Sequence, residues 1–429
     1  MSAELSSSPR APRSQPLCAA DIDAAARRIA PVVTPTPLQL SDRLSAITGA
    51  RVYLKREDLQ VVRSYKLRGA YNLLVQLSDE ELAAGVVCSS AGNHAQGFAF
   101  ACRTLGVHGR VYVPAKTPKQ KRDRIRYHGG DFIELIVGGS TYDLAAEAAL
   151  ADVERTGATL VPPYDDLRTI AGQGTVAVEL LAQLVGEPDL VVVPVGGGGC
   201  IAGITTYLAE RTTNAAVLGV EPAGAAAMMA ALAAGEPVTL DYVDQFVDGA
   251  AVRRAGTLTY AALAAAGDMV SITAVDEGAV CTAMLDLYQN EGIIAEPAGA
   301  LSVAGLLEAD IEPGSTVVCL ISGGNNDVSR YGEVLERSLV HLGLKHYFLV
   351  DFPQEPGALR RFLDDVLGPN DDITLFEYVK RNNRDTGEAL VGVELGSAAD
   401  LDGLLARMRA TDIHVEALEP GSPAYRYLL

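Results

Sequence analysis

Short apolar runs alternate with amphipathic stretches through the first three quarters of the chain. The runs are rich in β-branched residues and are bounded by glycine or proline, which is typical of strands buried on both faces of a parallel sheet. The stretches between them have helical spacing, so the pattern predicts a doubly wound α/β fold. The predicted strands are RVYLK (51–55), GVVCSS (85–90), GRVYVP (109–114), ATLVPP (158–163), DLVVVPV (189–195), AVLGVEP (216–222) and TVVCLI (316–321).

Three of these strands run directly into clusters of glycine and small polar residues. The clusters are SSAGNHAQG (89–97), VGGGG (195–199) and ISGGNND (321–327). Open α/β sheets bind their ligands just beyond the carboxyl ends of the strands. The three strand ends therefore predict one shared ligand cleft.

After Asn326 the pattern changes to that of a second, smaller unit. A helical segment, SRYGEVLERSLVHLGL, leads into strand, helix, strand, strand, helix and strand, the order of a split ferredoxin-like unit. The start of the chain is rich in serine, proline and arginine and has no apolar core. We expect a disordered tail over 1–20, a cleft-bearing domain over 21–330, a helical linker over 331–344 and an α+β domain over 345–429.

Composition and charge narrow the range of partners. The chain has 429 residues, 48% of them hydrophobic, which is enough for more than one buried core. A formal net charge of -19 repels nucleic acid and anionic lipid, and no run of about 18 apolar residues is present to span a bilayer. The six cysteines have no paired spacing, which argues against disulfides and zinc. We expect a soluble cytoplasmic protein without a nucleic-acid or membrane partner.

Lys66 is the candidate nucleophile. It lies in RSYKLRGA (63–70), between Tyr65 and the start of a predicted helix. A lysine that attacks carbonyl groups needs a lowered amine pKa, which burial or nearby cations provide. Because most lysines are solvated surface charges, this motif indicates a site only in combination with the strand-end clusters.

The second candidate element is a run of four glycines at a strand-to-helix turn. Such a turn lets backbone N–H groups close around an anion at the N-terminus of the helix. Neither the spaced GxGxxG pattern nor the lysine of a Walker loop is present here, so a monophosphate site is favoured over a dinucleotide site or a merely flexible turn. The residues are Gly196, Gly197, Gly198 and Gly199.

The remaining two strand ends offer small polar groups. One turn has bare backbone donors and an amide, which suit a carboxylate and a polar ring substituent; it consists of Ser89, Ser90, Ala91, Gly92 and Asn93. Ser322 offers one hydroxyl toward the same cleft. His94 is interpreted as structural.

The segments SYKLRGA, SSAGNHAQG, VGGGG and ISGGN, in this order and spacing, resemble the fold type II pyridoxal-phosphate enzymes, and most of all the biosynthetic threonine dehydratases. The resemblance covers about residues 21 to 330 and implies two open doubly wound subdomains like those of tryptophan synthase β. It implies pyridoxal 5'-phosphate as the cofactor. The implied reaction is dehydration and deamination of L-threonine to 2-oxobutanoate and ammonia, the first step of isoleucine biosynthesis, with some turnover of L-serine.

The resemblance also implies a role for each segment. Lys66 would hold the cofactor as a Schiff base and remove the Cα proton, and Asn93 would contact the ring hydroxyl. Ser322 would face the pyridine nitrogen, where a neutral group favours elimination over transamination. The glycines Gly196 to Gly199 with Cys200 would bind the phosphate, and the turn from Ser89 to Asn93 would hold the substrate carboxylate.

Two positions distinguish this chain from other members of the fold type. In the similar serine racemases the asparagine turn carries a serine that acts as acid and base on the second face; the matching position here is Ala91, which disfavours racemisation. Relatives that bind a divalent cation carry a Glu and an Asp after the corresponding strand. Glu221 is present, but Ala225, Ala226 and Ala227 carry no carboxylate, so we expect no required metal.

Residues 345–429, with FLVDFPQEPGALRRFL, look like a single ACT-like regulatory domain. This implies isoleucine as the feedback inhibitor, valine as its antagonist and a homotetramer. Three alternatives remain open on the sequence. They are a β-replacement enzyme of the same fold, a serine racemase or dehydratase, and a non-catalytic amino-acid sensor.

Overall fold

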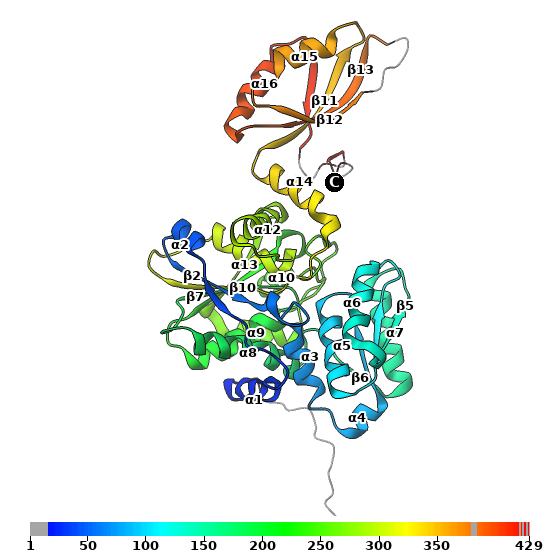
Figure 1. Cartoon of the computed structure of the whole chain (residues 1–429), viewed down its shortest axis with the longest axis vertical. Coiled ribbons are helices and arrows are strands. Elements are labelled where there is room, and N and C mark those ends of the chain that lie inside the picture. The colour runs from blue at the N-terminus through cyan, green and yellow to red at the C-terminus, as the bar shows by residue number, and fades with distance from the viewer. Residues whose placement is uncertain (1–15, 379–383, 420–421, 423, 426–427, 429) are drawn as a thin grey trace, which may run out of the picture. The chain divides into compact units, whose positions relative to one another are not determined.

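The structure is a computed structural model that describes residues 16–378, 384–419, 422, 424–425 and 428 (Figure 1). The chain divides into two compact units. The first runs to Val275 and includes Ile294–Asn326, and the second comprises Asp276–Ile293 and the chain from Asp327 onward. Helix α1 (Ala19–Ile29) begins two residues inside the predicted tail, while residues 1–15 of that prediction lie outside the described residues.

The larger sheet of the first unit has six strands in the order β1-β2-β10-β7-β8-β9. All neighbours are parallel except β1 and β2, which are antiparallel. Four of the predicted strands are confirmed here, whereas β1 and β9 were not predicted. The bounds are β1 (Leu38–Leu40), β2 (Arg51–Arg56), β7 (Leu190–Pro194), β8 (Ala216–Pro222), β9 (Val270–Val275) and β10 (Thr316–Ile321).

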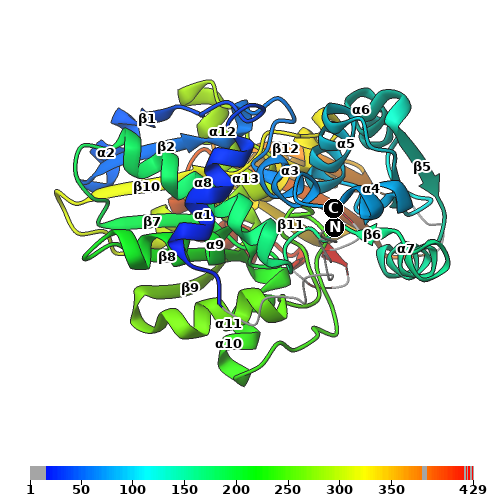
Figure 2. The ribbon, with the colours of Figure 1, turned by 90° about the horizontal axis from the view of Figure 1, so that it is seen from below.

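Helices cover both faces of this sheet, which is why residues of its central strands β7 and β10 are buried almost without interruption. Val191 and Val193 belong to the hydrophobic core that α8 (Leu167–Gln183) and α9 (Gly199–Arg211) share with α1. Figure 2 shows α1, α8 and α9 crossing the sheet. On the other side, Cys319 lies against α13 (Pro297–Glu308). The remaining helices of this subdomain are α2 (Asp42–Thr48), α10 (Ala227–Ala234) and α11 (Thr257–Ala266).

The smaller sheet of the first unit is wholly parallel, in the order β5-β4-β3-β6. Three of its strands were predicted, and β5 was missed because it is only half-buried. Helix α3 (Lys66–Leu74) packs against α5 of this subdomain and against α8 of the other, so it joins the two. The bounds are β3 (Val86–Ser89), β4 (Gly109–Val113), β5 (Ile133–Val137), β6 (Thr159–Leu160), α4 (Asp79–Ala84), α5 (Asn93–Leu105), α6 (Lys119–Gly129) and α7 (Tyr142–Thr156).

The second unit contains an antiparallel sheet in the order β12-β13-β11-β14, with α15 and α16 between its strands in sequence. The predicted order of strands and helices is confirmed, and Phe348, Phe362 and Val391 form the centre of its core. Helices α12 and α14 pack together, joined by the hydroxyls of Thr282 and Ser338 at 2.9 Å. The bounds are α12 (Glu277–Glu291), α14 (Tyr331–His341), β11 (Lys345–Pro353), α15 (Ala358–Val366), β12 (Asp372–Tyr378), β13 (Thr386–Glu394), α16 (Leu401–Arg409) and β14 (His414–Ala417).

Candidate active site

The ends of β3 and β10 meet beside the first turn of α3, although they belong to different sheets. The Tyr65 N–H donates to the Ser322 carbonyl oxygen over 3.2 Å, which places the loop after β10 against the residue preceding Lys66. Asn93, the first residue of α5, accepts a 2.8 Å hydrogen bond on its Oδ1 from Asn325 of the same loop. The predicted ligand site therefore draws on both subdomains of the first unit.

Lys66 is the first residue of α3, and its amine is largely removed from solvent. Nζ donates to the Pro163 carbonyl oxygen over 3.2 Å and lies 5.2 Å from the centre of the Tyr65 ring. Burial lowers the pKa of Lys66 to about 8, against the opposing influence of Cys200 and Glu296. A substantial fraction of this amine is therefore neutral near pH 8, as a nucleophile or base requires.

The four glycines form a turn in which side chains have no room. A Cβ on Gly197 would lie 2.3 Å from the Tyr164 ring, and a Cβ on Gly196 would lie 2.9 Å from the Ala250 backbone. Gly198 has a φ of +91°, a conformation that favours glycine, and it is the N-cap of α9. The turn thus brings bare backbone to the N-terminus of a 13-residue helix, where the first N–H groups have no helical acceptor.

The carbonyl oxygen of Gly197 is held away from this helix N-terminus. It accepts hydrogen bonds from Thr259 Oγ1 at 2.7 Å and from the Gly256 N–H at 3.2 Å. Cys200 lies in the first turn of α9, and burial raises the pKa of its thiol to about 12. The thiol is therefore neutral at physiological pH, so the end of the turn carries no negative charge to oppose an anion.

The turn after β3 contains buried polar atoms suited to a ligand. Within the described residues, the hydroxyl of Ser89 is buried without a hydrogen-bond partner, as is that of Ser64 beside Tyr65. Ser90 stabilises the turn itself by accepting the Gly92 N–H at 3.3 Å, and Ala91 adds no polar group. A buried hydroxyl without a partner is costly, so Ser89 and Ser64 indicate a missing polar contact.

Two other sequence interpretations can be placed. The Ser322 hydroxyl, 4% exposed, donates to the Ala298 carbonyl oxygen over a long 3.2 Å bond from which it can rotate. His94 is buried, with Nε2 2.8 Å from the Val161 carbonyl oxygen, and burial followed by the Lys66 charge lowers its pKa to about 3. The ring is neutral at physiological pH.

Sequence reasoning missed Glu296, which lies in the middle of this site. Its carboxylate accepts the Asn93 amide over 2.5 Å, and its N–H donates to the Gly323 carbonyl oxygen over 3.1 Å. It precedes Pro297 at the start of α13. The sequence signal was a carboxylate just before a helix, which usually indicates only a cap.

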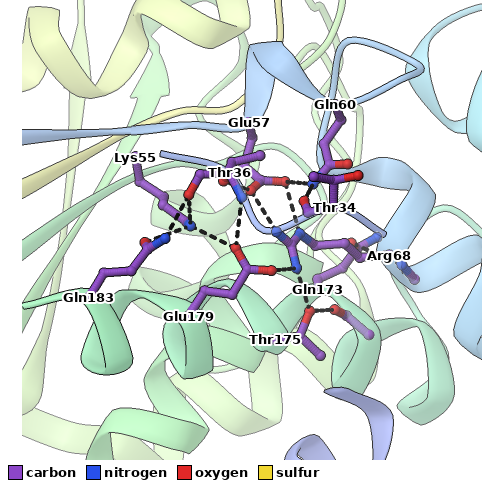
Figure 3. Close-up of polar contacts among 12 residues, drawn as sticks. Thr34, Thr36, Lys55, Glu57, Gln60, Arg68, Gln173, Thr175, Glu179 and Gln183 are labelled. Carbon is purple, nitrogen blue, oxygen red and sulfur yellow. Dashed lines mark hydrogen bonds and ion pairs between the residues drawn. The ribbon is translucent and has the colours of Figure 1, made fainter. Parts of the chain in front are cut away.

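A buried network of ion pairs, also missed, anchors α3 (Figure 3). Arg68 is fully buried two residues after Lys66, and its Nε and Nη2 donate to Glu57 at 2.8 and 2.7 Å. Its Nη1 pairs with Glu179 of α8 at 2.7 Å. Burial opposes the charge on Arg68, but Glu57 and Glu179 outweigh it and raise the pKa of Arg68.

The network is closed by a second cation, Lys55 of β2. Its Nζ lies 2.7 Å from Glu179 and 3.0 Å from Gln183, and Thr36 donates its hydroxyl to Glu57 at 2.6 Å. Two cations and two carboxylates therefore alternate, as Figure 3 shows, and their charges balance. Such a group is tolerated in the interior only when every member is paired.

Glycines let α3 approach α8 closely. A Cβ on Gly172 of α8 would lie 2.5 Å from the Arg68 carbonyl oxygen and 2.6 Å from the Cα of Gly69. Both neighbours are backbone atoms, so they cannot move away without displacing α3. The helix that begins at Lys66 is therefore held in place both by packing and by charge.

We expect Gly172→Ala to displace α3 and to lower the free energy of unfolding by about 1–3 kcal/mol, the usual effect of overpacking. Cofactor affinity should fall with it, because Lys66 moves with α3. Urea unfolding and cofactor titration measure the two effects. Gly332→Ala in α14 is the control, since its Cβ has open space and the change should be neutral or slightly stabilising. Equal stability and equal cofactor affinity of the two variants would contradict the close approach of α3 and α8 at Gly172.

Glu221 does not lie in a metal-like cluster. Its two carboxylate oxygens accept the N–H groups of Met228 and Met229, each at 2.8 Å. Burial raises the pKa of Glu221 to about 7. Among the described residues, no group of three or more histidine, cysteine, aspartate and glutamate side chains could hold a metal ion, and no helix is long and apolar enough to cross a membrane.

Comparison with known proteins identifies the class to which this fold and site belong. Residues 29–323 match the family described as pyridoxal-phosphate dependent enzyme, and residues 336–428 match the C-terminal regulatory domain of threonine dehydratase. The chain is 92% identical, over the full 429 residues of both proteins, to the L-threonine dehydratase biosynthetic IlvA of Mycobacterium tuberculosis.

Solved structures of similar proteins support the same family. The processed form of threonine deaminase isoform 2 from Solanum lycopersicum is 37% identical with a TM-score of 0.69, covering 76% of this chain and 96% of that one. Maize serine racemase is 31% identical with a TM-score of 0.69, covering 76% and 99%. The chain therefore belongs to the pyridoxal-phosphate dependent enzymes, and within them to the biosynthetic L-threonine dehydratases.

The residues present fit pyridoxal phosphate. A buried amine of lowered pKa lies at the start of α3, and a glycine turn without room for side chains lies at the N-terminus of α9. The buried hydroxyls of Ser64 and Ser89 have no partner within the described chain. An aldehyde, a phosphate and an amino-acid carboxylate would each find matching groups here.

Proposed function

We propose that this chain converts L-threonine to 2-oxobutanoate and ammonia, the first step of isoleucine biosynthesis, with some turnover of L-serine. The observation that carries the proposal is the Lys66 amine, buried beside Tyr65 and near Cys200 of the glycine turn, with a pKa of about 8. The near-identity to a biosynthetic L-threonine dehydratase supports the choice of substrate. A methyl group is worth about 1–3 kcal/mol of discrimination, so L-serine is not excluded.

We assign the site residues as follows. Lys66 binds the cofactor and Asn93 contacts its ring oxygen, while Ser322 faces the pyridine nitrogen. The glycine turn with Cys200 binds the phosphate through backbone N–H groups, supported by the absence of room for side chains at Gly196, Gly197, Gly198 and Gly199. The substrate carboxylate binds the turn formed by Ser89, Ser90, Ala91, Gly92 and Asn93, supported by the unpartnered Ser89 hydroxyl.

The reaction requires removal of a proton from Cα and loss of the β-hydroxyl. Pyridoxal phosphate, when bound, supplies the electron sink for the negative charge that develops at Cα. Lys66 removes the Cα proton, since its lowered pKa lies near the working pH. The hydroxyl leaves with a proton as water, and hydrolysis of the resulting enamine gives the oxo acid and ammonia.

Racemisation is disfavoured although serine racemases share the fold. Inversion at Cα needs a proton donor on the face opposite Lys66. The matching position in the asparagine turn is Ala91, which carries no hydroxyl. Elimination needs no such donor.

The second unit regulates the enzyme in this proposal. Isoleucine binds it as feedback inhibitor, valine opposes isoleucine, and the chains form a homotetramer in the cytoplasm. The catalytic domain spans 21–330, the linker 331–344 and the regulatory domain 345–429. The match of residues 336–428 to a threonine dehydratase regulatory domain supports an amino-acid effector.

The test follows 2-oxobutanoate formation from L-threonine with and without isoleucine. We expect turnover that isoleucine suppresses and valine restores. Turnover that isoleucine does not change would leave the lyase but remove the proposed effector. Product formation only when a second nucleophile is added would indicate a β-replacement enzyme, and failure to bind the cofactor would indicate an amino-acid sensor.

A further inference from the structure

The amide of Asn93 is held at both ends by residues that do not belong to its own helix. Its Nδ2 donates to Glu296 Oε1 over 2.5 Å, and its Oδ1 accepts from Asn325 Nδ2 over 2.8 Å. Asn325 Nδ2 also donates to the Val62 carbonyl oxygen over 2.8 Å. Because a carbonyl oxygen only accepts, the amide group of Asn325 is fixed as a donor, and Asn93 Oδ1 is fixed as its acceptor.

This chain of bonds determines which way the Asn93 amide faces. With Oδ1 turned to Asn325, Nδ2 must face Glu296. An amide nitrogen carries two hydrogens, so one remains after the bond to the carboxylate. Reversing the amide would place two donors against each other at Asn325 and two acceptors against each other at Glu296.

The Glu296 side chain is buried and closely packed. It is 5% exposed, and its backbone carbonyl oxygen accepts the N–H groups of Gly299 and Ala300 at the start of α13. A Cβ on Gly323 would lie 2.2 Å from Glu296 Oε1, so this carboxylate packs directly on the loop after β10.

Charged groups from several elements surround this carboxylate. Asp248, in the loop before α11, raises its pKa, while Lys121 of α6 lowers it and forms an ion pair with Asp248. Lys66 and Tyr65 also lie within electrostatic range. Burial is the largest influence and raises the pKa of Glu296 to about 7, despite the hydrogen bond from Asn93.

We propose that Glu296 is a positioning residue for the cofactor, which fixes the Asn93 amide so that its second Nδ2 hydrogen is presented to the ring oxygen of pyridoxal phosphate. The inference rests on the proposed contact between Asn93 and the cofactor. An ionised carboxylate accepts a stronger hydrogen bond than a neutral acid does. The hydrogen bond from Asn93 to Glu296 therefore weakens as Glu296 is protonated.

A double-mutant cycle on cofactor affinity tests this without measuring turnover. Asn93→Ala and Glu296→Ala should each weaken cofactor binding about tenfold, the effect of one hydrogen bond. In the Asn93→Ala background, Glu296→Ala should have no further effect. Two independent losses that multiply would overturn the positioning role. No loss in Asn93→Ala alone would instead remove the proposed contact of Asn93 with the cofactor.

Glu296→Gln keeps an acceptor for Asn93 and removes the ionisation, so it remains informative if Glu296→Ala does not fold. We expect cofactor affinity of the unaltered enzyme to fall as the pH decreases through about 7, and that component to vanish in Glu296→Gln. Lys66 titrates in both proteins, so the difference between them isolates Glu296. Glu308→Gln, an exposed carboxylate at the end of the same helix, is the control. An identical pH profile in Glu296→Gln and the unaltered enzyme would refute the inference.

Discussion

Lys66→Ala will reduce 2-oxobutanoate formation from L-threonine by a factor on the order of 10⁴, the upper end of what a positioned base contributes. In the proposed mechanism the variant loses both the attachment point of the cofactor and the base that removes the Cα proton. We expect no other lysine to take over, because Lys55, the one lysine that is fully buried among the described residues, is engaged with Glu179 and Gln183 in the network behind α3. The fold should survive, since within the described part of the chain the Lys66 side chain donates a single hydrogen bond, to Pro163.

Two readouts separate the roles of Lys66. Continuous assay of the oxo acid measures catalysis, and the absorbance of the bound cofactor before and after dialysis measures covalent attachment. Lys116→Ala, which removes an exposed lysine of the same unit, is the matched control and should retain both. Turnover of Lys66→Ala within tenfold of the unaltered enzyme would assign the base to another residue.

The strands of the first unit could be predicted where both faces are buried. The apolar runs at 190–194 and 316–321 are almost wholly buried, so burial left a continuous pattern. Strand β5 has the sequence IELIV but lies at the edge of the smaller sheet, half-exposed, and its pattern does not differ from that of a loop beside a helix. Strand β9, at the edge of the larger sheet, was missed for the same reason.

Within the candidate site, the glycine turn is the part whose residue types follow from backbone conformation. The glycine turn can be recognised in the sequence because Gly198 adopts a positive φ and its neighbours have no room for a Cβ, so glycine is required there. Glu296 is 203 residues from Asn93 in sequence, and nothing local to either indicates the 2.5 Å bond between them. A partnership made by the packing of two subdomains leaves no periodic signal along one chain.

The same limit applies to the network behind α3. Arg68 follows the predicted nucleophile so closely that its charge could have been interpreted as part of the active site. In the structure it faces away, toward Glu57 and Glu179, and is fully buried (Figure 3). Its function is to fix the helix that presents Lys66, which sequence spacing alone does not distinguish from binding a ligand.

Arg68→Met should therefore lower the free energy of unfolding by about 3–5 kcal/mol, because it leaves buried carboxylates without their main partner. Glu57 has no exposed surface, and burial alone would raise its pKa. Arg68, together with the Lys55 charge and the Thr36 hydrogen bond, outweighs that influence and holds the pKa of Glu57 below its ordinary value. In the unaltered protein Glu57 thus stabilises the fold above the pKa of the unfolded chain, and this contribution is lost as the pH falls.

In Arg68→Met the contribution of Glu57 to stability depends on pH in the opposite direction. Without Arg68, burial raises the pKa of Glu57, so the protonated form is favoured in the folded state and stability is lost as the pH rises. The deficit should consequently be larger at pH 7 than at pH 5, as measured by urea unfolding at each pH. Arg155→Met is the control, since Arg155 is 72% exposed and its partner Asp152 keeps Arg110; exposed pairs are worth about 0.2–1 kcal/mol.

Adding Glu57→Gln to Arg68→Met tests whether the lost stability comes from an unpaired buried charge. The double variant removes one of the uncompensated carboxylates, so it should regain part of the lost stability and lose the difference between pH 5 and pH 7. If the cavity left by the guanidinium were the main cause, the second substitution would restore nothing and the deficit would not depend on pH. Activity measurements distinguish a positioning role of Arg68 from a direct catalytic role. If the network only positions α3, Arg68→Met studied below its unfolding transition should bind the cofactor more weakly, because Lys66 is displaced. The pH profile of the chemical step should be unchanged.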